Sequence, residues 1–515
     1  MKILICNPLY TFDLGGRYEK YFIRSGARWP HSGIKRKGDT PHYLPFPFFL
    51  AYSAAWLRRE GFEVTALDCV ALGMGVEALA EAARKEKPDL VFFETATPTI
   101  TYDLDTARRL KAAAPGARLI LGGPHTTVYD EDALKAVPEV EFIVRGEYEE
   151  ALVELAKALR GGSDPAGVAG ITFRGPDGAP RSTGRRPLVD PLDKLPMPAY
   201  DLFPSNAAPD PGAYWDGFCQ HRPAVQMHAS RGCPYKCDFC LWNQVMYGNG
   251  RYRTFSPERL VEEAALLHER YGAKEIYFDD DDFTINAAHV RAIAEGLLAR
   301  GLKLKWSCMG DAINMTPDLL ALMAKSGCVG IKFGVETGSE RVIKKLGKPV
   351  DLRKVRELVR LCASHGIKTH ATFTLGLAED DQESLVETIA FLEDFDCDTI
   401  QVSVCTPLPG TRFFATAERE DLLKTKDWEK YDGKAGDVVR HRSLDLEQVA
   451  QMRSRALRRW VFNRLSSPRW LLRQARFLLR ILRGIGPAFV WEQARSIVEE
   501  EFLIPRNLER RGGGN

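Results

Sequence analysis

The chain has 515 residues, a length that accommodates about three domains with buried cores. Hydrophobic residues make up 45 % and charged residues 27 %, proportions that exclude a disordered, collagen-like or coiled-coil protein. The 71 lysines and arginines nearly balance the 69 aspartates and glutamates, so we expect no global electrostatic field that would recruit nucleic acid. The 11 cysteines are odd in number and too sparse for a disulfide scaffold.

The hydropathy of the chain predicts neither a signal peptide nor a membrane span. The apolar run after Lys2 is too short for a signal-peptide core and is typical of a buried strand. No run of about 18 apolar residues occurs, so we expect no spanning helix. The expected location is the cytoplasm, where cysteines serve as metal ligands, catalytic groups or packed side chains.

The first 165 residues alternate short apolar runs with amphipathic stretches such as Phe48–Arg59 and Asp103–Ala113. This alternation predicts an α/β domain of Rossmann-like type with a doubly wound parallel sheet. Ligands bind such sheets at the carboxyl ends of their strands. The candidate strands are Lys2–Cys6, Glu63–Asp68, Leu90–Glu94, Arg118–Leu121 and Phe142–Arg145.

Three further regions follow in the chain. Residues 166–222 are rich in glycine, proline and aspartate and are predicted to be a linker, except that Ile171–Arg174 is predicted to be a strand that runs into the turn Gly175–Gly178. Residues 223–430 alternate again, and their pattern predicts a partial (β/α)6 barrel of TIM type with its chemistry at the strand carboxyl ends. Residues 431–515 are predicted to be a helical domain. The candidate barrel strands are Val225–Ala229, Glu275–Phe278, Lys305–Cys308, Gly330–Gly334, Lys368–Leu375 and Thr399–Thr406.

A cysteine motif follows the first candidate barrel strand, where a barrel site is expected. Its members Cys233, Cys237 and Cys240 lie within eight residues. Three thiolates on one loop can ligate three irons of a 4Fe–4S cluster and leave the fourth iron open to a substrate. A structural zinc site would need a fourth cysteine or histidine at a regular spacing, and no second pair of ligands follows. Zinc binding and simple burial of the thiols are the alternatives.

The pattern Cys-x-x-x-Cys-x-aromatic-Cys, with Phe239 as the aromatic residue, resembles the radical S-adenosylmethionine (SAM) superfamily. Together with the N-terminal domain, the later strand ends are similar to the cobalamin-binding radical SAM family, which includes the class B methyltransferases. The resemblance covers about residues 1–430. The matching segments at those later strand ends are Asp280–Thr284, Gly334–Ser339, Phe373–Leu377 and Thr406–Thr411.

The resemblance implies roles for individual barrel residues. The three cysteines would hold the cluster, with Phe239 beside it among the cofactor-binding residues. Asp280 or Asp281 is a candidate for binding the amino group of SAM. An ordinary helix N-cap is the alternative for this pair. Glu336 and Ser339 are candidates for the ribose or methionine part of SAM, although Ser339 could instead cap the helix that starts at the next residue.

The resemblance also implies cobalamin in the N-terminal domain. Small residues at two strand ends match those between which the nucleotide tail of cobalamin inserts, since glycines permit close approach and hydroxyls bond the tail. Many cobalamin domains ligate cobalt with a histidine after the first strand, but Asn7–Gly16 contains none, so the lower axial ligand stays open. An ordinary turn is the alternative for the two glycines. The candidate cofactor-binding residues are Thr95, Thr97, Gly122, Gly123 and His125.

Two segments stand outside the motifs. The insertion Thr11–Pro45 is predicted to be a lid. No acidic residue lies between Glu447 and Glu492, and ten arginines fall between Arg453 and Arg483. A basic amphipathic helix here could contact an anionic membrane surface. The alternative is a helix packed on the barrel with its arginines solvated or paired. The predicted arginine stripe is Arg469, Arg473, Arg476, Arg480 and Arg483, and the adjoining apolar stripe is Leu471, Ala475, Leu478 and Leu482.

The resemblance implies a radical SAM enzyme. In such enzymes the reduced cluster cleaves SAM to a 5′-deoxyadenosyl radical, which abstracts hydrogen from an unactivated substrate carbon. We expect C-methylation with methylcobalamin as the methyl source. The alternatives are a cobalamin-dependent cyclase, oxidase or rearrangement enzyme, or, in another class, a cobalamin sensor or an iron–sulfur electron carrier. Expected partners are a small-molecule or lipid-like substrate and an electron donor such as flavodoxin or ferredoxin, but no nucleic acid. The sequence does not identify the substrate.

Overall fold

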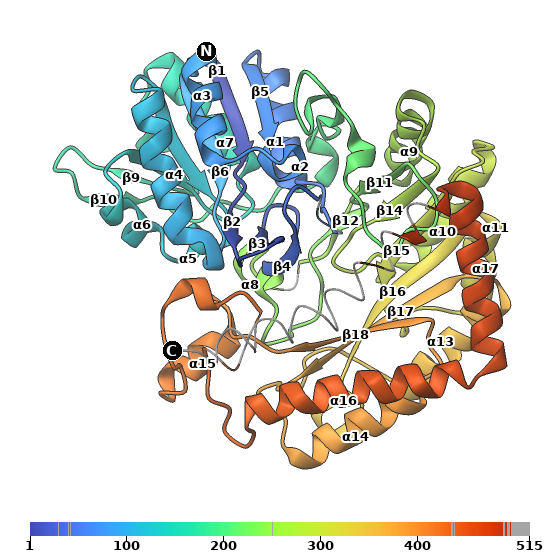
Figure 1. Ribbon diagram of the computed structural model, residues 1–515. Coiled ribbons are helices and arrows are strands. Elements are labelled where there is room, and N and C mark those ends of the chain that lie inside the picture. The colour runs from blue at the N-terminus through green and yellow to red at the C-terminus, as the bar shows by residue number, and fades with distance from the viewer. Residues whose placement is uncertain are drawn as a thin grey trace.

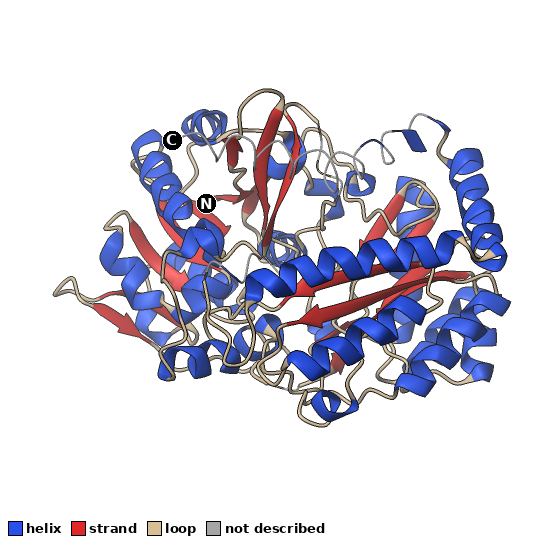
Figure 2. Ribbon diagram, turned by 60° about the horizontal axis from the view of Figure 1, so that its bottom comes forward, coloured by secondary structure: helices blue, strands red, loops and turns tan. Residues whose placement is uncertain are grey.

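The computed structural model describes residues 1–487, 490, 491 and 495, except for residues 29, 40, 42, 250, 434, 435 and 437. Figure 1 shows two α/β bodies side by side, the N-terminal one in blue and the later one in green to orange, with red helices at the C-terminal end. Figure 2 shows helices covering the strands of both bodies.

Within the described residues, the N-terminal sheet has seven strands in the order β10-β9-β8-β7-β6-β1-β5. The predicted parallel sheet is confirmed, because β1 pairs in parallel with both β5 and β6. Side chains of β1 alternate between two cores, Ile3 and Ile5 on one face and Leu4 and Cys6 on the other. The parallel strands are β1 Lys2–Asn7, β5 Glu63–Asp68, β6 Leu90–Glu94, β7 Arg118–Gly122 and β8 Val140–Val144.

Helices cover both faces of this sheet. One core contains residues of α1 and α7, and the other contains residues of α3 and α4. This arrangement places the ligand-binding edge at the strand carboxyl ends, as expected of a doubly wound sheet. The covering helices are α1 Phe48–Arg59, α3 Val76–Glu86, α4 Ile100–Ala113 and α7 Glu149–Gly161.

The sheet extends beyond the predicted domain boundary at residue 165. Strands β9 Ile171–Arg174 and β10 Pro180–Ser182 form an antiparallel hairpin that pairs with β8. The predicted strand Ile171–Arg174 and the turn after it are therefore confirmed. The prediction of a linker is wrong for β10 and for the pairing of this hairpin with the N-terminal sheet, because Pro180–Ser182 carries little apolar signal.

The predicted lid has secondary structure of its own. It forms a three-stranded antiparallel sheet made of β2 Thr11–Asp13, β3 Tyr18–Ile23 and β4 His31–Arg36. The Arg28 guanidinium then reaches the barrel, where it donates to the carbonyl oxygens of Asp279 at 2.6 Å and Asp280 at 2.7 Å. The insertion therefore connects the two bodies. Its action as a lid stays a prediction.

The predicted partial barrel is confirmed. Six strands of the described chain pair in parallel in the order β11-β14-β15-β16-β17-β18, so β11 and β18 are its open edges. The strands are β11 Ala224–Met227, β14 Glu275–Phe278, β15 Lys305–Gly310, β16 Cys328–Glu336, β17 Lys368–Leu375 and β18 Thr399–Val404. The long outer helices are α9 Pro257–Tyr271, α10 Ala287–Ala299, α11 Pro317–Lys325, α13 Leu352–Ser364 and α14 Gln382–Asp394.

The C-terminal region is helical over its described part, as predicted. Helix α16 lies along the edge strand β18, where the Arg453 guanidinium donates to the Val402 carbonyl at 2.5 Å. Figure 2 shows this long helix crossing in front of the barrel strands. The long helices of this region are α16 Leu446–Leu465 and α17 Pro468–Gly484, and α15 Arg412–Arg419 precedes the region.

No described helix is both long and apolar enough to span a membrane. The seven cysteines outside the motif and the linker are all buried. Short helices and strands connect the layers of the fold. They are α2 Cys69–Leu72, α5 Pro124–Val128, α6 Asp130–Ala136, α8 Leu241–Val245, α12 Glu340–Ile343, β12 Ser230–Arg231 and β13 Arg253–Thr254.

The carboxyl ends of the two sheets meet. Helix α5, which follows β7, packs against α8, which follows the cysteine motif. Gly410, which follows β18, lies between them at a φ of 84°. A Cβ atom there would lie 2.6 Å from the side chains of both Val128 and Val245. The two edges predicted to bind ligands therefore face one shared region.

Candidate functional site

The three motif cysteines lie on the loop between β12 and α8, as free and partly exposed thiols. The loop starts at Gly232, whose φ of 80° favours glycine. A Cβ atom there would lie 1.8 Å from the Arg251 carbonyl oxygen. The Gly232 amide donates to Asp281 Oδ2 at 3.0 Å. The loop is thus fixed at its first residue by backbone geometry that only glycine can adopt.

Gln244, which the sequence did not single out, fixes the far end of the loop. Its Nε2 donates to the carbonyl oxygens of Cys237 at 3.2 Å, Asp238 at 2.9 Å and Cys240 at 3.0 Å. Its Oε1 accepts from the Arg412 amide at 2.9 Å. One side chain therefore contacts three carbonyls of the cysteine loop and one backbone amide beyond it. Only its position four residues after Cys240 could have suggested this role.

The donor set of the loop suits an iron–sulfur cluster better than a single ion. No group of three histidine, cysteine, aspartate or glutamate side chains in the described chain is arranged to hold one metal ion. A cluster places each thiolate on a different iron, so its ligands need not converge on a point. Burial raises the pKa of all three thiols, that of Cys237 to about 12 and that of Cys240 to about 11. Metal coordination deprotonates such thiols outright.

The two candidate aspartates after β14 have different surroundings. Asp280 is fully buried and accepts from the Ala229 amide at 3.0 Å and from Ser230 Oγ at 2.5 Å, so it fixes the turn after β11. Burial raises its pKa to about 7. Asp281 accepts from the cysteine loop and lines a pocket. Neither caps a helix, because Asn286 is the N-cap of α10. Binding of the SAM amino group stays a prediction.

Glu336, at the end of β16, has a φ of 66°, which is strained for a residue with a side chain. Its carboxylate accepts from Lys348 Nζ at 3.1 Å and from Thr374 Oγ1 at 3.0 Å. Lys348 also donates to the Gly334 carbonyl at 2.9 Å. Although burial opposes its charge, the Glu336 carboxylate and the Cys237 thiol raise the pKa of Lys348. Lys348 lies in no motif, so no sequence pattern points to it.

Ser339 occupies the N-cap position of α12, but its side chain makes no capping hydrogen bond. Its Oγ is buried and has no partner among the described residues, and the same holds for Thr406 Oγ1 beyond β18. The alternative that Ser339 simply caps the helix is therefore wrong. Two unsatisfied hydroxyls at strand carboxyl ends suit a polar ligand such as SAM. Phe239 is partly buried in a cluster with Val342, Leu346, Leu377, Cys405 and Phe413.

The structure brings together the predicted cobalamin residues at the ends of β6 and β7. Thr95 Oγ1 donates to the Gly122 carbonyl at 2.9 Å, and Thr97 Oγ1 lies 3.2 Å from His125 Nδ1. Gly123 has a φ of 95°, and a Cβ atom there would lie 2.5 Å from the Thr95 carbonyl oxygen. Burial lowers the pKa of His125 to about 3, so its imidazole is neutral. Cofactor contact stays a prediction for all five.

The described loop after β1 contains Tyr10 and no histidine. Tyr10 is buried and its hydroxyl donates to Asp103 Oδ1 at 2.9 Å. Asp103 also accepts from Thr99 Oγ1 at 2.8 Å and pairs with Arg24 from the insertion. The first loop is thus tied into the domain by polar contacts. The absence of a histidine there agrees with the open lower ligand.

A cluster of four charged residues, here called the junction cluster, joins the two bodies beside the cysteine loop. Arg231 donates to Glu147 Oε1 at 2.8 Å and to Glu149 Oε1 at 2.6 Å, and Arg253 donates to Glu147 Oε2 at 2.8 Å. Arg231 is 0 % exposed. Burial alone would raise the pKa of Glu147, but the two arginines hold it below its usual value. The glutamates follow β8, so no local pattern predicts their partners.

A narrow pocket lies between the insertion, α1, β12 and α8. The His228 ring stacks on Phe48 at a centroid distance of 3.6 Å. Its Nδ1 is buried without a partner among the described residues, and burial lowers its pKa well below the usual value. The pocket thus offers one neutral ring nitrogen among aromatic walls and two charged groups. Its lining residues are Gly26, Arg28, Phe48, Phe49, His228, Ser230, Trp242, Tyr247 and Asp281.

Comparison with known proteins agrees with this architecture. The family model of the radical SAM superfamily matches residues 227–392, and that of the B12 binding domain matches residues 38–156. An uncharacterized methyltransferase of Pyrococcus horikoshii is 31 % identical over 411 residues, which cover 80 % of this chain and 86 % of that protein. An anaerobic magnesium-protoporphyrin IX monomethyl ester cyclase of Rubrivivax gelatinosus is 27 % identical over 418 residues, covering 78 % and 70 %.

Among solved structures, the radical SAM methyltransferase TsrM of Kitasatospora setae, with cobalamin and a 4Fe–4S cluster bound, has a similar fold. Its TM-score is 0.60 at 18 % identity, covering 81 % of this chain and 78 % of that one. The fold and the cysteine loop define a radical SAM enzyme. More closely, the chain belongs to the cobalamin-binding radical SAM family. Its cofactors are a 4Fe–4S cluster, SAM and cobalamin.

Proposed function

We propose that the protein is a cobalamin-dependent radical SAM methyltransferase that methylates an unactivated carbon of a small-molecule substrate. One observation supports the proposal that SAM and cobalamin act on the same substrate. The carboxyl ends of both sheets meet beside the cysteine loop, where the junction cluster joins the N-terminal domain to the start of that loop. A substrate in this region would be within reach of groups from both domains.

When bound, the cluster and SAM supply a carbon radical, and cobalamin supplies the methyl group. The chain's own part is to position and to exclude water. The cysteine loop would hold the cluster, with its carbonyls fixed by Gln244. Glu336, oriented by Lys348 and Thr374, and the free hydroxyl of Ser339 would bind SAM. Residues at the ends of β6 and β7 would hold the cobalamin tail.

Methylation is favoured over the other outcomes by the 31 % identical relative, which is named as a methyltransferase. The cyclase relative supports the second candidate, a cobalamin-dependent cyclase that does not transfer a methyl group. The two outcomes differ in their products. A methyltransferase releases S-adenosylhomocysteine together with 5′-deoxyadenosine, whereas a cyclase releases 5′-deoxyadenosine alone.

The electron donor is also a proposal. A low-potential carrier such as flavodoxin or ferredoxin would reduce the cluster. A lipid-like substrate and a cytoplasmic location stay predictions of the same kind. Contact of the C-terminal helices with a membrane is a separate proposal that does not depend on the reaction.

The deciding experiment is anaerobic reconstitution of the full chain with iron, sulfide, cobalamin, SAM and a reductant. We expect the absorbance of a 4Fe–4S cluster and formation of 5′-deoxyadenosine, and S-adenosylhomocysteine in equal amount once substrate is added. The Cys237→Ala variant should lose the cluster absorbance and both products.

Cys362→Ala is the matched control, because this buried thiol lies on α13 outside the loop. It should keep the cluster and both products. If Cys237→Ala still cleaved SAM, the cluster assignment would be wrong. If wild-type protein produced no 5′-deoxyadenosine, a sensor or an electron carrier would replace the enzyme.

A further inference from the structure

The C-terminal helices carry an unusual concentration of exposed apolar side chains. Of the 11 large hydrophobic residues exposed in the described chain, seven lie between residues 461 and 479. Phe462 is 75 % exposed, and Leu465 and Leu472 are each 55 % exposed. Exposed apolar side chains concentrated in this way are typical of an interaction site. The seven, here called the apolar surface, are Val461, Phe462, Leu465, Leu471, Leu472, Leu478 and Leu479.

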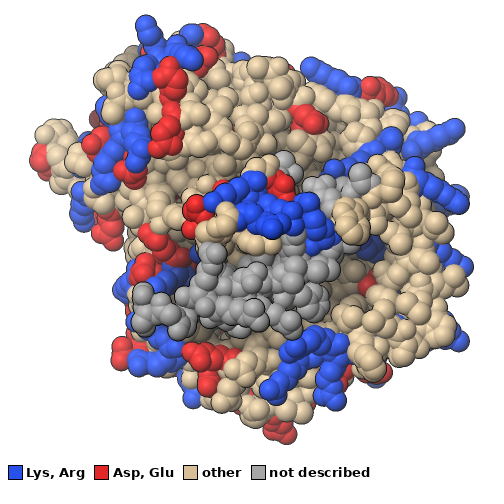
Figure 3. Space-filling view, in the orientation of Figure 1, with Lys and Arg blue, Asp and Glu red and all other residues tan. Residues whose placement is uncertain are grey.

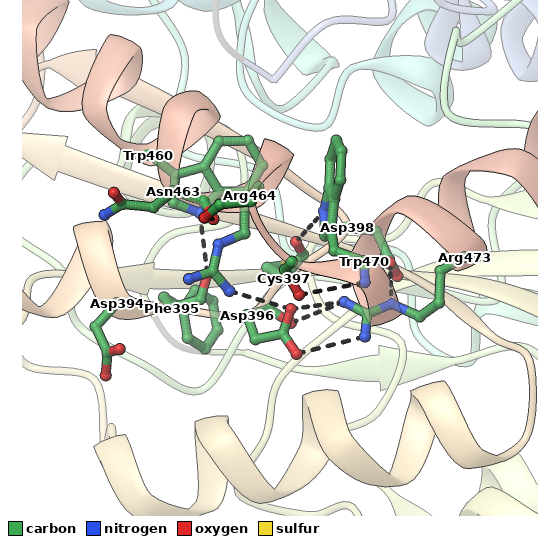
Figure 4. A network of polar contacts seen from close by, with 12 residues as sticks. Asp394, Phe395, Asp396, Cys397, Asp398, Trp460, Asn463, Arg464, Trp470 and Arg473 are labelled. Carbon is green, nitrogen blue, oxygen red and sulfur yellow. Dashed lines mark hydrogen bonds and ion pairs between the residues drawn. The ribbon is translucent and has the colours of Figure 1, made fainter.

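The outward orientation of these leucines follows from polar contacts on the inner side of α17. Arg473 donates to Asp398 Oδ1 at 2.8 Å and to Asp396 Oδ1 at 2.7 Å (Figure 4). The Trp470 indole donates to the Cys397 carbonyl at 3.1 Å, and Phe477 is buried. Arginine, tryptophan and phenylalanine therefore attach the helix to the barrel. With 3.6 residues per turn, the leucines are left on the opposite face.

Arginines border this face on one side. Arg469, Arg476 and Arg483 are seven residues apart, exposed, and in no ion pair with another described residue. No acidic residue lies from 448 to 491 to balance them. Figure 3 shows basic side chains beside uncharged surface at the right margin, where Figure 1 places α17. The five arginines of the predicted stripe therefore have two kinds of surroundings. Arg473 and Arg480 contact the barrel, and the other three face solvent.

Helix α17 lies at the end of the barrel opposite the cysteine loop. Arg480 is 3.3 Å from Gln220 Oε1 and 3.4 Å from the Gly366 carbonyl oxygen. Gln220 precedes β11 and Gly366 precedes β17, so both lie at the amino ends of barrel strands. Figure 1 likewise shows α17 on the side of the barrel remote from the N-terminal sheet. A partner on this face would not cover the catalytic region.

We propose that the apolar surface docks onto an anionic lipid bilayer, with the leucines and Phe462 at the acyl boundary and the exposed arginines on headgroup phosphates. This combination of an apolar face and a basic border is what interfacial helices present to such membranes. A second copy of the chain is disfavoured, because pairing α17 with itself would bring arginine rows together with no acidic residue between them. The contact anchors the enzyme and leaves the strand carboxyl ends free.

The test is flotation of full-length protein with vesicles of phosphatidylcholine alone or mixed with phosphatidylglycerol. We expect binding to the anionic vesicles that weakens with salt. The double variant Leu472→Glu/Leu479→Glu should bind about tenfold or more weakly, because two apolar contacts are lost and two charges are added. Leu298→Glu, which alters an isolated leucine exposed by 36 % on α10, is the matched control and should bind as wild type.

Thermal unfolding and SAM cleavage of each variant should match wild type, which separates loss of docking from misfolding and from failure of the proposed reaction. Equal binding to neutral and anionic vesicles, or undiminished binding by the double variant, would overturn the proposal. So would a wild-type dimer in sedimentation that the double variant converts to monomer, since the occupant would then be a second copy.

Discussion

Arginine has opposite surroundings in two regions of this molecule. In the junction cluster, Arg231 and Arg253 are buried between the two domains and bonded to glutamates of a distant segment. On α17, exposed arginines border leucines that also face solvent. A buried arginine whose hydrogen bonds are satisfied fixes one domain against another, whereas an exposed one adds charge to a surface. Arginine thus holds two domains together in the junction cluster, whereas on α17 it adds positive charge to a surface that a partner can contact.

The strongest test of this contrast is Arg231→Met, which leaves the buried Glu149 without its partner and Glu147 with Arg253 alone. We expect it to lower the free energy of unfolding by about 3–5 kcal/mol, as found when one partner of a buried ion pair is removed. Urea unfolding measures the effect. Arg251→Met is the matched control, because Arg251 pairs with Asp190 on the surface. It should cost only about 0.5 kcal/mol. Equal effects would mean that the junction cluster does not hold the domains.

Glu263 extends the comparison to a buried acidic residue that lacks a close charged partner. It is as buried as Glu147, but its nearest charged partner, Arg259, is 4.0 Å away. Burial raises its pKa to about 7, despite Arg259 and a hydrogen bond from Tyr200. The folded protein therefore binds this proton more tightly than the unfolded chain does. Stability should fall as pH rises from the carboxyl's ordinary value of 4.5 to about 7.

Glu263→Gln should remove that dependence. The variant should equal wild type below pH 4.5 and exceed it by about 3 kcal/mol above pH 7, since each tenfold difference in proton affinity corresponds to about 1.4 kcal/mol. Denaturant unfolding across this range measures the difference. A constant offset between the two proteins at every pH would show that Glu263 does not titrate in this window.

A smaller effect is expected where α17 attaches to the barrel. Arg473→Met removes hydrogen bonds to Asp396 and to the buried Asp398. We expect a loss of about 1–2 kcal/mol, because Asp398 keeps bonds from Thr369. Thermal unfolding measures it, and no change would mean that the tryptophan contacts alone hold the helix.

The smallest effect on stability belongs to the exposed arginines. Arg476→Met should change the free energy of unfolding by less than about 0.5 kcal/mol, because no described acidic group pairs with it. It should nevertheless weaken binding to anionic vesicles about fivefold, the contribution of one basic residue near such a surface. Arg251→Met again serves as the control and should bind vesicles as wild type.

Much of the fold could be predicted from local pattern. The pattern predicts strands Glu63–Asp68, Leu90–Glu94 and Lys368–Leu375 at the bounds that the structure has, because each is a continuous or alternating apolar run between clear breaks. The pattern also predicts the strand Ile171–Arg174 before its polar turn, but not its partner β10, because Pro180–Ser182 has little apolar signal. The place of this hairpin in the sheet depends on pairing with β8, which lies about 30 residues earlier.

Some residues of the candidate site could likewise be predicted from the sequence, and others could not. The cysteine loop could be found because its ligands are close in sequence. Gln244 and Lys348 could not, because their partners are loop carbonyls and a strained carboxylate that exist only in the folded chain. The pairing of Glu147 with Arg231 spans 84 residues, so no local pattern encodes it. The sequence correctly places Ser339 at a helix start, but only the structure leaves its hydroxyl unbonded.

The open edge of the barrel has a consequence for how this chain can be shortened. Strand β18 ends the sheet, and α16 lies along it with Arg453 bonded to the Val402 carbonyl. A fragment that stops before Leu446 keeps every motif residue but uncovers that strand. Unprotected edges recruit strands from other molecules. The radical SAM and B12 binding domains produced alone would therefore tend to associate through this edge, which α16 covers in the full chain.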